Sequence, residues 1–536
     1  MILVNAAEMQ QMDKTTIEAF GIPGRVLMEN AGRGATRWLM ENFPDVAGRR
    51  IGVLAGRGNN GGDGFVIARY LFRQGAQVTV YLLSDRDRVA GDAAANLALL
   101  EPLGVPVICV PDAEVFAEQQ KAMAHESLLV DAILGTGLNS DVSGFFRTVI
   151  EFVNAFRASG RPVFAVDIPS GLHTDTGKPC GICVTADATA TFAFAKTGHL
   201  LFPGAAYTGA LRVIDIGIPN HIAAEADPGK WLLTPSLVAG YLTPRSATAH
   251  KGNTGHLLVA AGTPGKTGAA AMTAMSAMRA GAGLVTLAVP ESINAIVEPM
   301  VLEPMTLPVG EKGATFIDNT CVDAILSETA GKSCMALGPG IGTADATRQV
   351  VHRLIKESDI PLVIDADGLS CIAGDCDVLK GAKRPVVLTP HPGEMARLAG
   401  TTAADVQENR LKHASEFAER YNVHVVLKGA GTVIAHPDGR IFLNRTGNPG
   451  MAAGGMGDVL TGVIAGLVCQ GYPCGRAARI GTYVHGAAAD ILSRRLGRQG
   501  FLAADVMAAV PEALNRLFET SSHAHADGFP HTDIFC

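Results

Sequence analysis

The stretch GNPGMAAGGMGDVLTGVIAGLVCQG, residues 447–471, decides the fold of the second half of this chain. A glycine-rich turn over Gly454–Gly457 precedes Asp458, and the apolar segment Val459–Val468 that follows is typical of a buried helix. Because the first amides of a helix have no intrahelical partner, such a turn lets them converge on an anion. An aspartate beside that anion hole can take a proton from a hydroxyl that attacks phosphorus, although the same aspartate also suits a simple helix cap. The stretch therefore indicates a phosphoryl-transfer site.

Short apolar segments alternate with helical ones throughout the rest of the chain. In the second half the expected strands are Gly255–Ala261, Leu284–Val289, Ser333–Leu337, Leu362–Ile364, Val386–Leu388 and Val423–Leu427. In the first half they are Arg49–Ala55, Gln77–Leu83, Ser127–Leu134 and Pro162–Ile168, with an amphipathic helix over Gly64–Gln74. Strands separated by helices predict mostly parallel sheets that are covered on both faces. The fold class is therefore α/β.

The length of 536 residues predicts more than one domain, because single cores stop growing at about 250–300 residues. The alternating pattern weakens between residues 220 and 245, where prolines and polar residues interrupt it. We expect an N-terminal domain over residues 1–225, a linker over 226–245, a second domain over 246–517 and a flexible polar tail over 518–536.

Composition excludes several classes of function. The formal net charge is -7 and no basic patch is apparent, which argues against nucleic-acid binding. No run is long and apolar enough for a membrane span, and the N-terminus MILVNAAEMQQMDK does not resemble a signal peptide. The 10 cysteines are scattered, and the lone pair Cys180 and Cys183 has neither a second pair nor a redox context, so we expect buried thiols. A cytoplasmic location is expected.

A glycine-rich loop follows the first strand of the N-terminal half. The loop GRGNNGGDG, residues 56–64, satisfies G-x-G-x-x-G, and Asp85 follows the next strand where a ribose-binding acid is expected. Taken alone, this motif favours a dehydrogenase with a Rossmann fold. The consecutive Asn59 and Asn60 add amide oxygens that a plain pyrophosphate turn does not need, although asparagines also suit a tight turn.

Two further polar loops follow strands of the same half. DAILGTGLNSDVSG spans residues 131–144, and VDIPSGLHTDTG spans residues 166–177. Because open parallel sheets bind ligands at the carboxyl ends of their strands, we expect the three loops to form one site.

These loops, with LMENAG at residues 27–32, closely resemble the epimerase domain of the YjeF-type NAD(P)HX repair family. The family interconverts the R and S hydrates of NADH and NADPH, so the resemblance implies a Rossmann-like αβα domain that binds the hydrated dinucleotide. It implies dinucleotide contacts from the residues Asn59, Asn60, Gly61, Gly62, Asp63, Gly135, Thr136, Gly137, Leu138, Asn139, Ser140, Asp141 and Asp167. It also implies a potassium ion on Asn60, Asp131 and Ser170. Asp167 is our candidate for proton transfer, and Lys196 is a second group in reach.

The 447–471 stretch resembles the Gly-Ala-Gly-Asp anion hole of ribokinase-fold enzymes, and most closely the NAD(P)HX dehydratase branch. Supporting motifs are GAAAMTAMSAMRAGAGLVTLAVP (268–290), ALGPGIG (336–342), VIDADGLS (363–370), LTPHPGEMARL (388–398) and VLKGAGTVI (426–434). Together they cover nearly the whole second half and imply a ribokinase-like αβα domain. The family usually has Asn where this chain has Ser370, which puts that single contact in doubt.

The resemblance implies that a nucleotide phosphorylates the hydroxyl of the hydrate and that phosphate then leaves. Asp458 deprotonates the hydroxyl, and an anion hole of Gly454, Gly455, Met456 and Gly457 holds the phosphoryl group. The adenine nucleotide is held by Lys428, Gly429, Ala430, Gly431, Thr432 and Gly457, and the hydrate by Ala270, Gly340, His391 and Asp458. Magnesium bridges the nucleotide phosphates. The fused arrangement favours ADP as the donor, and both parent families commonly self-associate, so a homo-oligomer is expected.

Three other interpretations remain open. A ribokinase-fold kinase of the thiamine-precursor type would use Asp458 equally well, but it does not explain a second complete site. A nicotinamide-dependent oxidoreductase does not explain Asn59 and Asn60. A non-enzymatic binding module is disfavoured because the polar residues of the N-terminal loops are all present. The run AAGTPGKT, residues 260–267, ends like a Walker A loop but lacks its first glycine.

Overall fold

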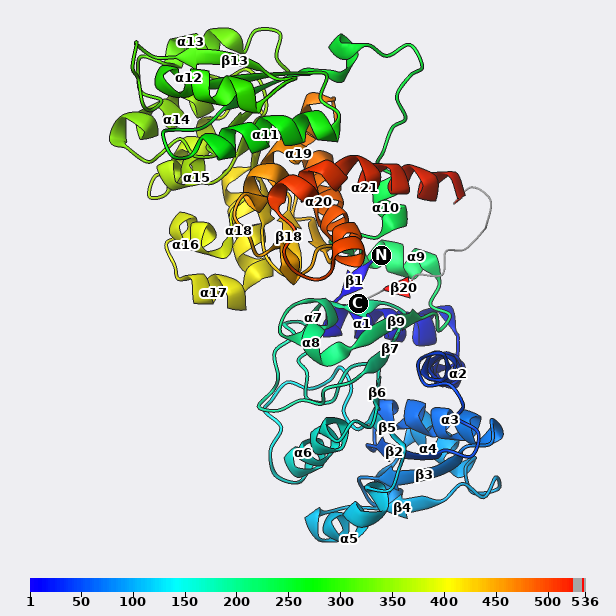
Figure 1. Cartoon of the computed structure of the whole chain (residues 1–536). Helices are drawn as coiled ribbons and strands as arrows, with labels where there is room; N and C mark the ends of the chain where they lie inside the picture. Colours follow the sequence, from blue (N-terminus) through cyan, green and yellow to red (C-terminus); the bar gives the residue numbers. More distant parts are fainter. Residues whose placement is uncertain (524–532, 535–536) are drawn as a thin grey trace. The chain divides into compact units, whose positions relative to one another are not determined.

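The computed structural model describes residues 1–523 and 533–534 and divides the chain into two compact units (Figure 1). Of the described residues, 2–228 and 533–534 form the N-terminal unit. Residue 1 and residues 229–523 form the C-terminal unit. The two units are described separately below.

The N-terminal unit is built on an eight-stranded sheet with the order β20-β9-β7-β6-β5-β2-β3-β4. Its strands are β2 (Arg50–Ala55), β3 (Gln77–Leu82), β4 (Val107–Cys109), β5 (Leu128–Ala132), β6 (Val163–Val166), β7 (Ala188–Phe192), β9 (Ala210–Ile214) and β20 (Asp533–Ile534). All neighbours are parallel except β20 and β9. A separate parallel pair joins β1 (Leu3–Val4) to β8 (Ala195–Lys196).

Alternate residues of these strands enter two apolar clusters, one on each face of the sheet. One cluster joins Ile51 and Val53 to helices α2 (Gly24–Asn42), α3 (Asn59–Arg73) and α4 (Gly91–Ala98). The other joins Leu54 and Leu129 to α5 (Ala113–Met123) and α6 (Gly144–Ala158), on the opposite side in Figure 1. Because successive side chains of a strand point to opposite faces, a sheet that is apolar throughout needs helices on both sides. The remaining helices are α1 (Ala6–Lys14), α7 (Thr197–Leu200), α8 (Gly204–Thr208) and α9 (Asn220–Ala226).

The C-terminal unit has a ten-stranded sheet with the order β10-β19-β18-β17-β16-β15-β14-β11-β12-β13. Its strands are β10 (Lys230–Leu232), β11 (His256–Ala260), β12 (Leu284–Pro290), β13 (Met305–Val309), β14 (Cys334–Leu337), β15 (Leu362–Ile364), β16 (Val386–Leu388), β17 (His424–Leu427), β18 (Thr432–Ala435) and β19 (Ile441–Asn444). The sheet is parallel from β13 to β17, and β18 runs antiparallel to both of its neighbours.

One face of this sheet is covered by α11 (Thr267–Ala280), α19 (Met456–Cys469), α20 (Cys474–Leu496) and α21 (Ala503–His523), which share one apolar cluster with the strands. The apolar residues of α14 (Asp345–Glu357) and α18 (Arg410–Tyr421) lie outside that cluster, and α18 packs on β17 and β18. The other helices are α10 (Pro235–Ala239), α12 (Glu291–Val297), α13 (Val322–Glu328), α15 (Asp367–Ile372), α16 (Pro392–Ala399) and α17 (Ala403–Glu408). Both units are therefore layered α/β folds, which confirms the predicted fold class.

Two helices begin earlier than the sequence pattern indicates. Helix α3 starts at Asn59, inside the glycine-rich loop, and α19 starts at Met456, inside the anion-hole stretch. Gly455 adopts a left-handed backbone with φ of 86°, which favours glycine and lets the chain turn directly into the helix. The polar residues that we assigned to loops thus occupy first helical turns, where backbone amides are free to bind a ligand.

The segment over residues 226–245, expected as a linker, carries short regular elements. Strand β10 pairs parallel with β19, and Trp231 stacks on Phe442 with ring centroids 5.1 Å apart. Long-range pairing with a strand that lies far along the chain gives this segment its structure, and the local sequence carries no signal for it. The expected tail begins inside α21, and residues 524–532 and 535–536 of it lie outside the described residues. Among the described residues, every helix is too short or too polar to cross a membrane.

The contact between α11 and α19 gives a test of the C-terminal core. A methyl group at Gly462 would lie 2.0 Å from the Ser276 hydroxyl and 2.1 Å from the Thr273 carbonyl oxygen. Since neither helix can move away without opening the core, we expect Gly462→Ala to lower the free energy of unfolding by about 1–3 kcal/mol. Urea unfolding followed by the fluorescence of Trp231, in a Trp38→Phe background, measures this.

Gly268→Ala is the matched control, because Gly268 also lies in a helix but its added methyl would meet no atom within 4 Å. This variant should leave the midpoint unchanged or raise it, since alanine lowers the entropy of the unfolded chain. Equal midpoints for the two variants would contradict the close α11–α19 packing.

Candidate functional sites

The three polar loops of the N-terminal unit meet at the carboxyl ends of β2, β5 and β6, around a cavity of about 660 Å³. The predicted residues that line it are Asn59, Asn60, Asp63, Gly135, Thr136, Gly137, Leu138 and Asp167. Lys196 lines it as well. Gly61 and Gly62 are buried in the first turn of α3, and Asn139, Ser140 and Asp141 are exposed outside the lining. The structure therefore brings most of the predicted set together.

A buried ion pair joins Lys196 and Asp167 in this cavity. The Lys196 ammonium lies 2.5 Å from Asp167 Oδ1 and also donates to the Thr191 hydroxyl at 2.8 Å and the Phe192 carbonyl oxygen at 3.2 Å. Burial by itself raises the pKa of Asp167, but the charge and hydrogen bond of Lys196 outweigh it and lower that pKa below its usual value. Asp167 also has a φ of 61°, a strained backbone for a residue with a side chain. The carboxylate is thus held ionised at a fixed position.

Asp131, Ser170 and Asn60 form a second buried group behind the cavity wall. Asp131 accepts hydrogen bonds from the Ser170 hydroxyl at 2.5 Å and the Ser170 amide at 2.8 Å. Asn60 Nδ2 donates to the Leu134 carbonyl oxygen at 3.1 Å, whereas Asn60 Oδ1 is buried without any hydrogen-bond partner among the described residues. Burial raises the pKa of Asp131 to about 6. Asn60 and Ser170 both donate to the Leu134 carbonyl oxygen, so an unpartnered oxygen, a carboxylate and a hydroxyl are linked through one backbone group. Oxygen ligands of this kind suit a hard monovalent cation.

Two more carboxyls face the same cavity. Burial raises the pKa of Asp63 well above its usual value, and the negative charges of Asp167 and Asp13 raise it further. Burial also raises the pKa of Asp13, on α1, to about 6, against the opposing effect of Lys196. Asp13 was not among our predicted residues, since nothing in the local sequence links α1 to the three loops.

In the C-terminal unit, Asp458 lies in the first turn of α19, next to the anion-hole glycines. Burial raises the pKa of Asp458 to about 6, and the carboxylate of Asp365 raises it further against the lowering effect of Lys428. The first amides of α19 have no intrahelical acceptor and face the same end of the helix as Asp458. The turn therefore combines an anion-binding backbone with a carboxyl of raised proton affinity.

Beside this turn, a buried ion pair joins Lys428 and Asp365. The Lys428 ammonium lies 2.8 Å from Asp365 Oδ1 and 3.8 Å from Glu394 Oε2. Asp365 Oδ2 accepts from the Thr461 hydroxyl of α19 at 2.7 Å, and an added methyl at Gly457 would lie 3.3 Å from the Lys428 ammonium. The negative charges of Asp365 and Glu394 raise the pKa of Lys428 although burial opposes them, so the lysine is charged.

His391 is the N-cap of α16. Its Nδ1 accepts from the amide of Gly393 at 3.0 Å, and its Nε2 lies 3.3 Å from Glu394 Oε1. Burial lowers the pKa of His391, so the ring is neutral at neutral pH. The half-exposed ring thus caps the helix, and its contact with the hydrate stays a prediction.

Arg410 fixes the loop over residues 428–432 through hydrogen bonds to its backbone. Its guanidinium is buried and donates to the carbonyl oxygens of Leu427 at 3.0 Å, Lys428 at 3.3 Å and Gly431 at 3.3 Å. Three backbone acceptors on one planar donor fix the shape of the loop, which carries the predicted nucleotide contacts Lys428, Gly429, Ala430, Gly431 and Thr432.

Gly340 and Ala270 follow β14 and β11, whose carboxyl ends lie at the same edge of the sheet as the end of β15. The Gly340 carbonyl oxygen accepts from the Thr263 hydroxyl at 2.9 Å, and Ala270 is fully buried in the apolar cluster. Lys266, from the run that resembles a Walker A loop, pairs instead with Asp367 at 2.7 Å. Ala270 thus offers a ligand only its backbone.

Asp365, Glu394 and Arg410 are functional-site residues that the sequence analysis did not select. Asp365 directly follows β15, and the strand-end rule that selected Asp131 and Asp167 applies to it equally. Glu394 and Arg410 lie on helices, and their proximity to Lys428 depends on how the helices pack.

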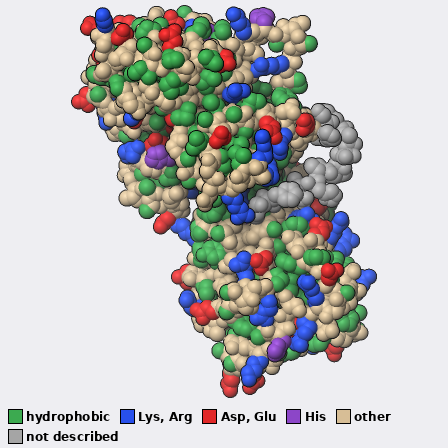
Figure 2. Space-filling model, in the orientation of Figure 1, with side chains coloured by type: hydrophobic (Ala, Val, Ile, Leu, Met, Phe, Trp, Pro, Cys, Tyr) green, Lys and Arg blue, Asp and Glu red, His purple; other side chains and the backbone are tan. Residues whose placement is uncertain are grey.

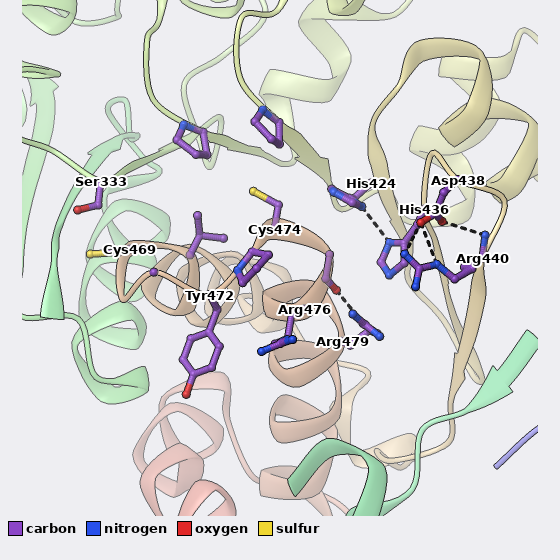
Figure 3. Close-up of a pocket in the computed structure, with 16 residues that line it drawn as sticks. Ser333, His424, His436, Asp438, Arg440, Cys469, Tyr472, Cys474, Arg476 and Arg479 are labelled. Atoms are coloured by element: carbon purple, nitrogen blue, oxygen red, sulfur yellow. Dashed lines mark hydrogen bonds and ion pairs between the residues drawn. The ribbon is translucent and has the colours of Figure 1, made fainter. Parts of the chain in front are cut away.

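A separate cavity of about 530 Å³ lies at the opposite, amino edge of this sheet (Figure 3). Ser333, Pro361 and Pro385 precede β14, β15 and β16 there, and His424 begins β17. His424 and His436 share a 2.9 Å contact between their Nδ1 atoms. The cavity holds none of the predicted residues. On the face shown in Figure 2, acidic and basic side chains are intermixed.

Cys180 and Cys183 are buried free thiols, as predicted. Burial raises the pKa of Cys183 to about 12, so its thiol stays protonated at neutral pH. Within the described residues, no group of three or more His, Cys, Asp or Glu side chains is arranged to hold a metal ion.

Two layered α/β units, each with a charged site at the carboxyl edge of its own sheet, define a two-site enzyme for nucleotide-like ligands. A family model described as NAD(P)H-hydrate dehydratase matches residues 257–512, and one described as YjeF-related protein N-terminus matches residues 24–198. The chain is 43% identical over 520 residues to the bifunctional NAD(P)H-hydrate repair enzyme of Moorella thermoacetica, covering 97% of this chain and 98% of the relative. It is 34% identical over 520 residues to the enzyme of that name from Escherichia coli K12, covering 97% and 95%.

The chain belongs to the bifunctional NAD(P)H-hydrate repair enzyme family, which confirms the family predicted from its motifs. Among solved structures it is similar to the ADP/ATP-dependent NAD(P)H-hydrate dehydratase of Bacillus subtilis co-crystallised with ATP and Mg²⁺. The identity is 30%, the TM-score is 0.46, and the match covers 54% of this chain and 98% of that one.

The raised pKa of Asp458 predicts that its ionised form lowers the stability of the fold at neutral pH. A carboxyl whose folded pKa, about 6, exceeds its usual 3.8 binds its proton more tightly in the folded state, so its contribution to stability falls as pH rises from about 4 to about 6. We therefore expect Asp458→Asn to raise the free energy of unfolding at pH 7 by about 1–3 kcal/mol and to have no effect below about pH 4. Denaturant titrations at the two pH values measure this.

Asp438→Asn is the control of opposite sign. A hydrogen bond from Arg440 lowers the pKa of Asp438 to about 2, so this carboxylate adds stability above about pH 4 and loses it as pH falls. Stabilisation by Asp438→Asn, or none by Asp458→Asn at pH 7, would contradict the assigned environments.

Proposed function

We propose that the chain repairs hydrated nicotinamide dinucleotides in two steps at two sites. The N-terminal unit interconverts R- and S-NAD(P)HX, and the C-terminal unit dehydrates the S form to NAD(P)H at the expense of ADP, with release of AMP and phosphate. The observation that carries the proposal is that each unit has its own buried lysine–aspartate pair beside carboxyls of raised pKa.

In the epimerase unit, we assign dinucleotide binding to the loops over residues 59–63 and 135–141. Support comes from the cavity that they line and from the first turn of α3, whose free amides suit a pyrophosphate. Asp167 stays ionised beside Lys196, so we assign it to contact the substrate and to accept a proton rather than donate one.

In the dehydratase unit, we assign Asp458 as the base that takes the proton of the substrate hydroxyl. Hydroxide is a poor leaving group and phosphate a good one, so phosphorylation of that hydroxyl makes elimination feasible. The amides of Gly454, Gly455, Met456 and Gly457 stabilise the transferring phosphoryl group, and charged Lys428 adds to the attraction. His391, Gly340 and Ala270 are assigned to the hydrate.

The loop held by Arg410 is assigned to the adenine nucleotide, with ADP as the donor. Magnesium bound to the nucleotide phosphates would neutralise part of their charge. It commonly needs only one or two carboxylates from the protein, because phosphates and waters complete its shell.

Potassium is assigned to Asn60, Asp131 and Ser170. The fit rests on the buried Asn60 Oδ1, which lacks a hydrogen-bond partner among the described residues, and on the oxygens of Asp131 and Ser170, which are linked to Asn60 through Leu134. A cation held there would offset the buried negative charge of Asp131 and would fix the loop over residues 134–137, to which Asn60 and Ser170 are bonded.

We further assign the protein to the cytoplasm as a homo-oligomer. Every cysteine in the described part of the chain is a free thiol, which suits a reducing compartment. The exposed apolar residues Ile296, Met300, Leu302 and Met305 lie at the β13 edge of the sheet, where a second copy would cover them. A small-molecule kinase is the less favoured reading, because it leaves the N-terminal site without a role.

A racemic mixture of R- and S-NADHX with ADP, magnesium and potassium tests the two steps, with ATP in a parallel reaction. Wild-type enzyme should convert all of the substrate to NADH, measured by absorbance. Asp458→Asn should reduce NADH formation about 10²–10⁴-fold, because the base is lost. Asp167→Asn should stop the reaction at half, since only the S form is then consumed.

Chromatographic separation of the R and S forms without nucleotide is the companion measurement. Asp458→Asn should still equilibrate the two forms at the wild-type rate. Loss of both activities in either single variant with the fold intact would refute separate sites, and no NADH with either nucleotide would refute the repair function.

Removal of potassium tests the cation site. Replacing potassium with tetramethylammonium should lower the melting temperature of the N-terminal unit, because a ligand that binds only the folded state stabilises it. The same exchange should not affect Asn60→Leu, which lacks the assigned oxygen. An equal shift in both proteins would show that the salt acts elsewhere.

A further inference from the structure

Two carboxyls in the epimerase cavity lack a direct hydrogen bond or ion pair with the part of the chain that the structure describes. Asp13 and Asp63 both line the cavity, and no described residue makes a hydrogen bond or ion pair with either side chain. Asp63 is buried, with 8% of its surface exposed, and Asp13 is partly buried. Buried carboxyls without partners are rare in proteins, because removal of a carboxylate from water is costly. Their retention here indicates a ligand group that they serve.

The third carboxyl of the cavity is already engaged. Asp167 holds the Lys196 ammonium at 2.5 Å and the Thr191 hydroxyl at 3.0 Å. One ammonium therefore faces three carboxyls, and it is bonded to one of them. His199 is fully buried with a pKa lowered to about 3, and so adds no positive charge. Arg57 and Asp92, which also line the cavity, balance one another in formal charge. The excess negative charge is relieved when Asp13 and Asp63 each keep a proton.

The position of Asp13 is fixed by the fold. Strand β1 precedes α1 and pairs in parallel with β8, with Val4 opposite Lys196. The Ala6 amide at the start of α1 donates to Asp175 at 2.8 Å, and Met9 and Met12 are buried. The pairing of β1 with β8 thus positions both Lys196 and the helix that carries Asp13, although the two residues lie far apart in the sequence.

We propose that Asp13 is the proton donor of the epimerisation, that Asp63 keeps its own proton in the same cavity, and that Asp167 remains the carboxylate. The inference rests on the proposed epimerase activity and assigns its acid. Asp13 gives its proton to the hydroxyl oxygen on the ring carbon, and the bond between that carbon and the oxygen breaks with its electron pair on the oxygen. Water leaves, and the adjacent ring nitrogen supplies its electron pair to the carbon.

The reverse step completes the inversion. Water adds to the opposite face of the flat ring carbon, the electron pair returns to the ring nitrogen, and a carboxylate of the cavity takes the proton from the added water. Proton exchange with solvent water returns the proton to Asp13 and restores the starting state. No oxidant or other co-reactant is needed, and atoms and charge balance over the cycle. Negative Asp167 stabilises the positive charge on the ring between the two steps.

The test uses the full-length enzyme with R-NADHX, ADP and magnesium, so that NADH forms only after epimerisation. Asp13→Asn should slow NADH formation from R-NADHX about 10²–10⁴-fold, because it keeps the shape but cannot donate the acid proton. Its rate from S-NADHX should stay within twofold of wild type. Asp13→Glu should recover part of the R-NADHX rate. The R-NADHX rate of the wild-type enzyme should fall as pH rises above about 6, and the pH profile of Asp13→Asn should lack this fall.

Lys14→Gln is the matched control. Lys14 is the exposed neighbour of Asp13 on α1 and pairs only with Glu18 at the surface, so its loss should leave both rates within twofold. Calorimetric titration of Asp13→Asn with NADPH should show binding within a few-fold of wild type, which establishes a folded site.

The outcomes separate the inference from the function on which it rests. An Asp13→Asn enzyme that consumes R-NADHX within twofold of wild type would overturn the role of Asp13. So would loss of NADPH binding together with turnover, which would make Asp13 a binding residue. A wild-type enzyme that consumes S-NADHX but does not accelerate use of R-NADHX would refute the epimerase activity itself.

Discussion

A single buried lysine lies against one aspartate at each site, and the chemistry of both sites depends on that pairing. Lys196 holds Asp167 in one unit, and Lys428 holds Asp365 in the other. Lys196 keeps its partner Asp167 ionised against the effect of burial. Burial and the negative charge of nearby carboxylates raise the pKa of Asp13 and of Asp458 to about 6, although the two lysines oppose this. In the cavity of the N-terminal unit, an ionised and a protonatable carboxyl thus line the same space.

The parallel sheets explain why this arrangement occurs at the same place in both units. Asp131 lies near the carboxyl end of β5, and Asp167 and Asp365 directly follow β6 and β15, where neighbouring strands deliver their loops to one edge. Helices α3 and α19 begin inside the glycine-rich stretches, so free amides stand next to the carboxyls. Anion binding by the backbone and proton transfer by side chains are thereby combined without a basic surface.

The strand-end rule and the glycine patterns located most of both sites from the sequence. They found Asp131, Asp167 and Asp458, and the segments that became the central strands. They did not find Asp13, Glu394 or Arg410, because each lies on a helix whose own sequence is that of an ordinary amphipathic surface. The antiparallel strands β18 and β19 and the edge strand β10 were missed for a related reason, since pairing partners far along the chain stabilise short strands.

The sequence by itself determined the α/β class, the presence of two units, the family and the positions of the two anion-binding turns. These depend on local patterns: apolar periodicity, glycine spacing and polar residues at strand ends. Only the tertiary structure decided which carboxyl is ionised and which holds a proton, and how α1 reaches the epimerase cavity. Proton affinity depends on burial and on charges brought close from distant parts of the chain, and no local pattern records those distances.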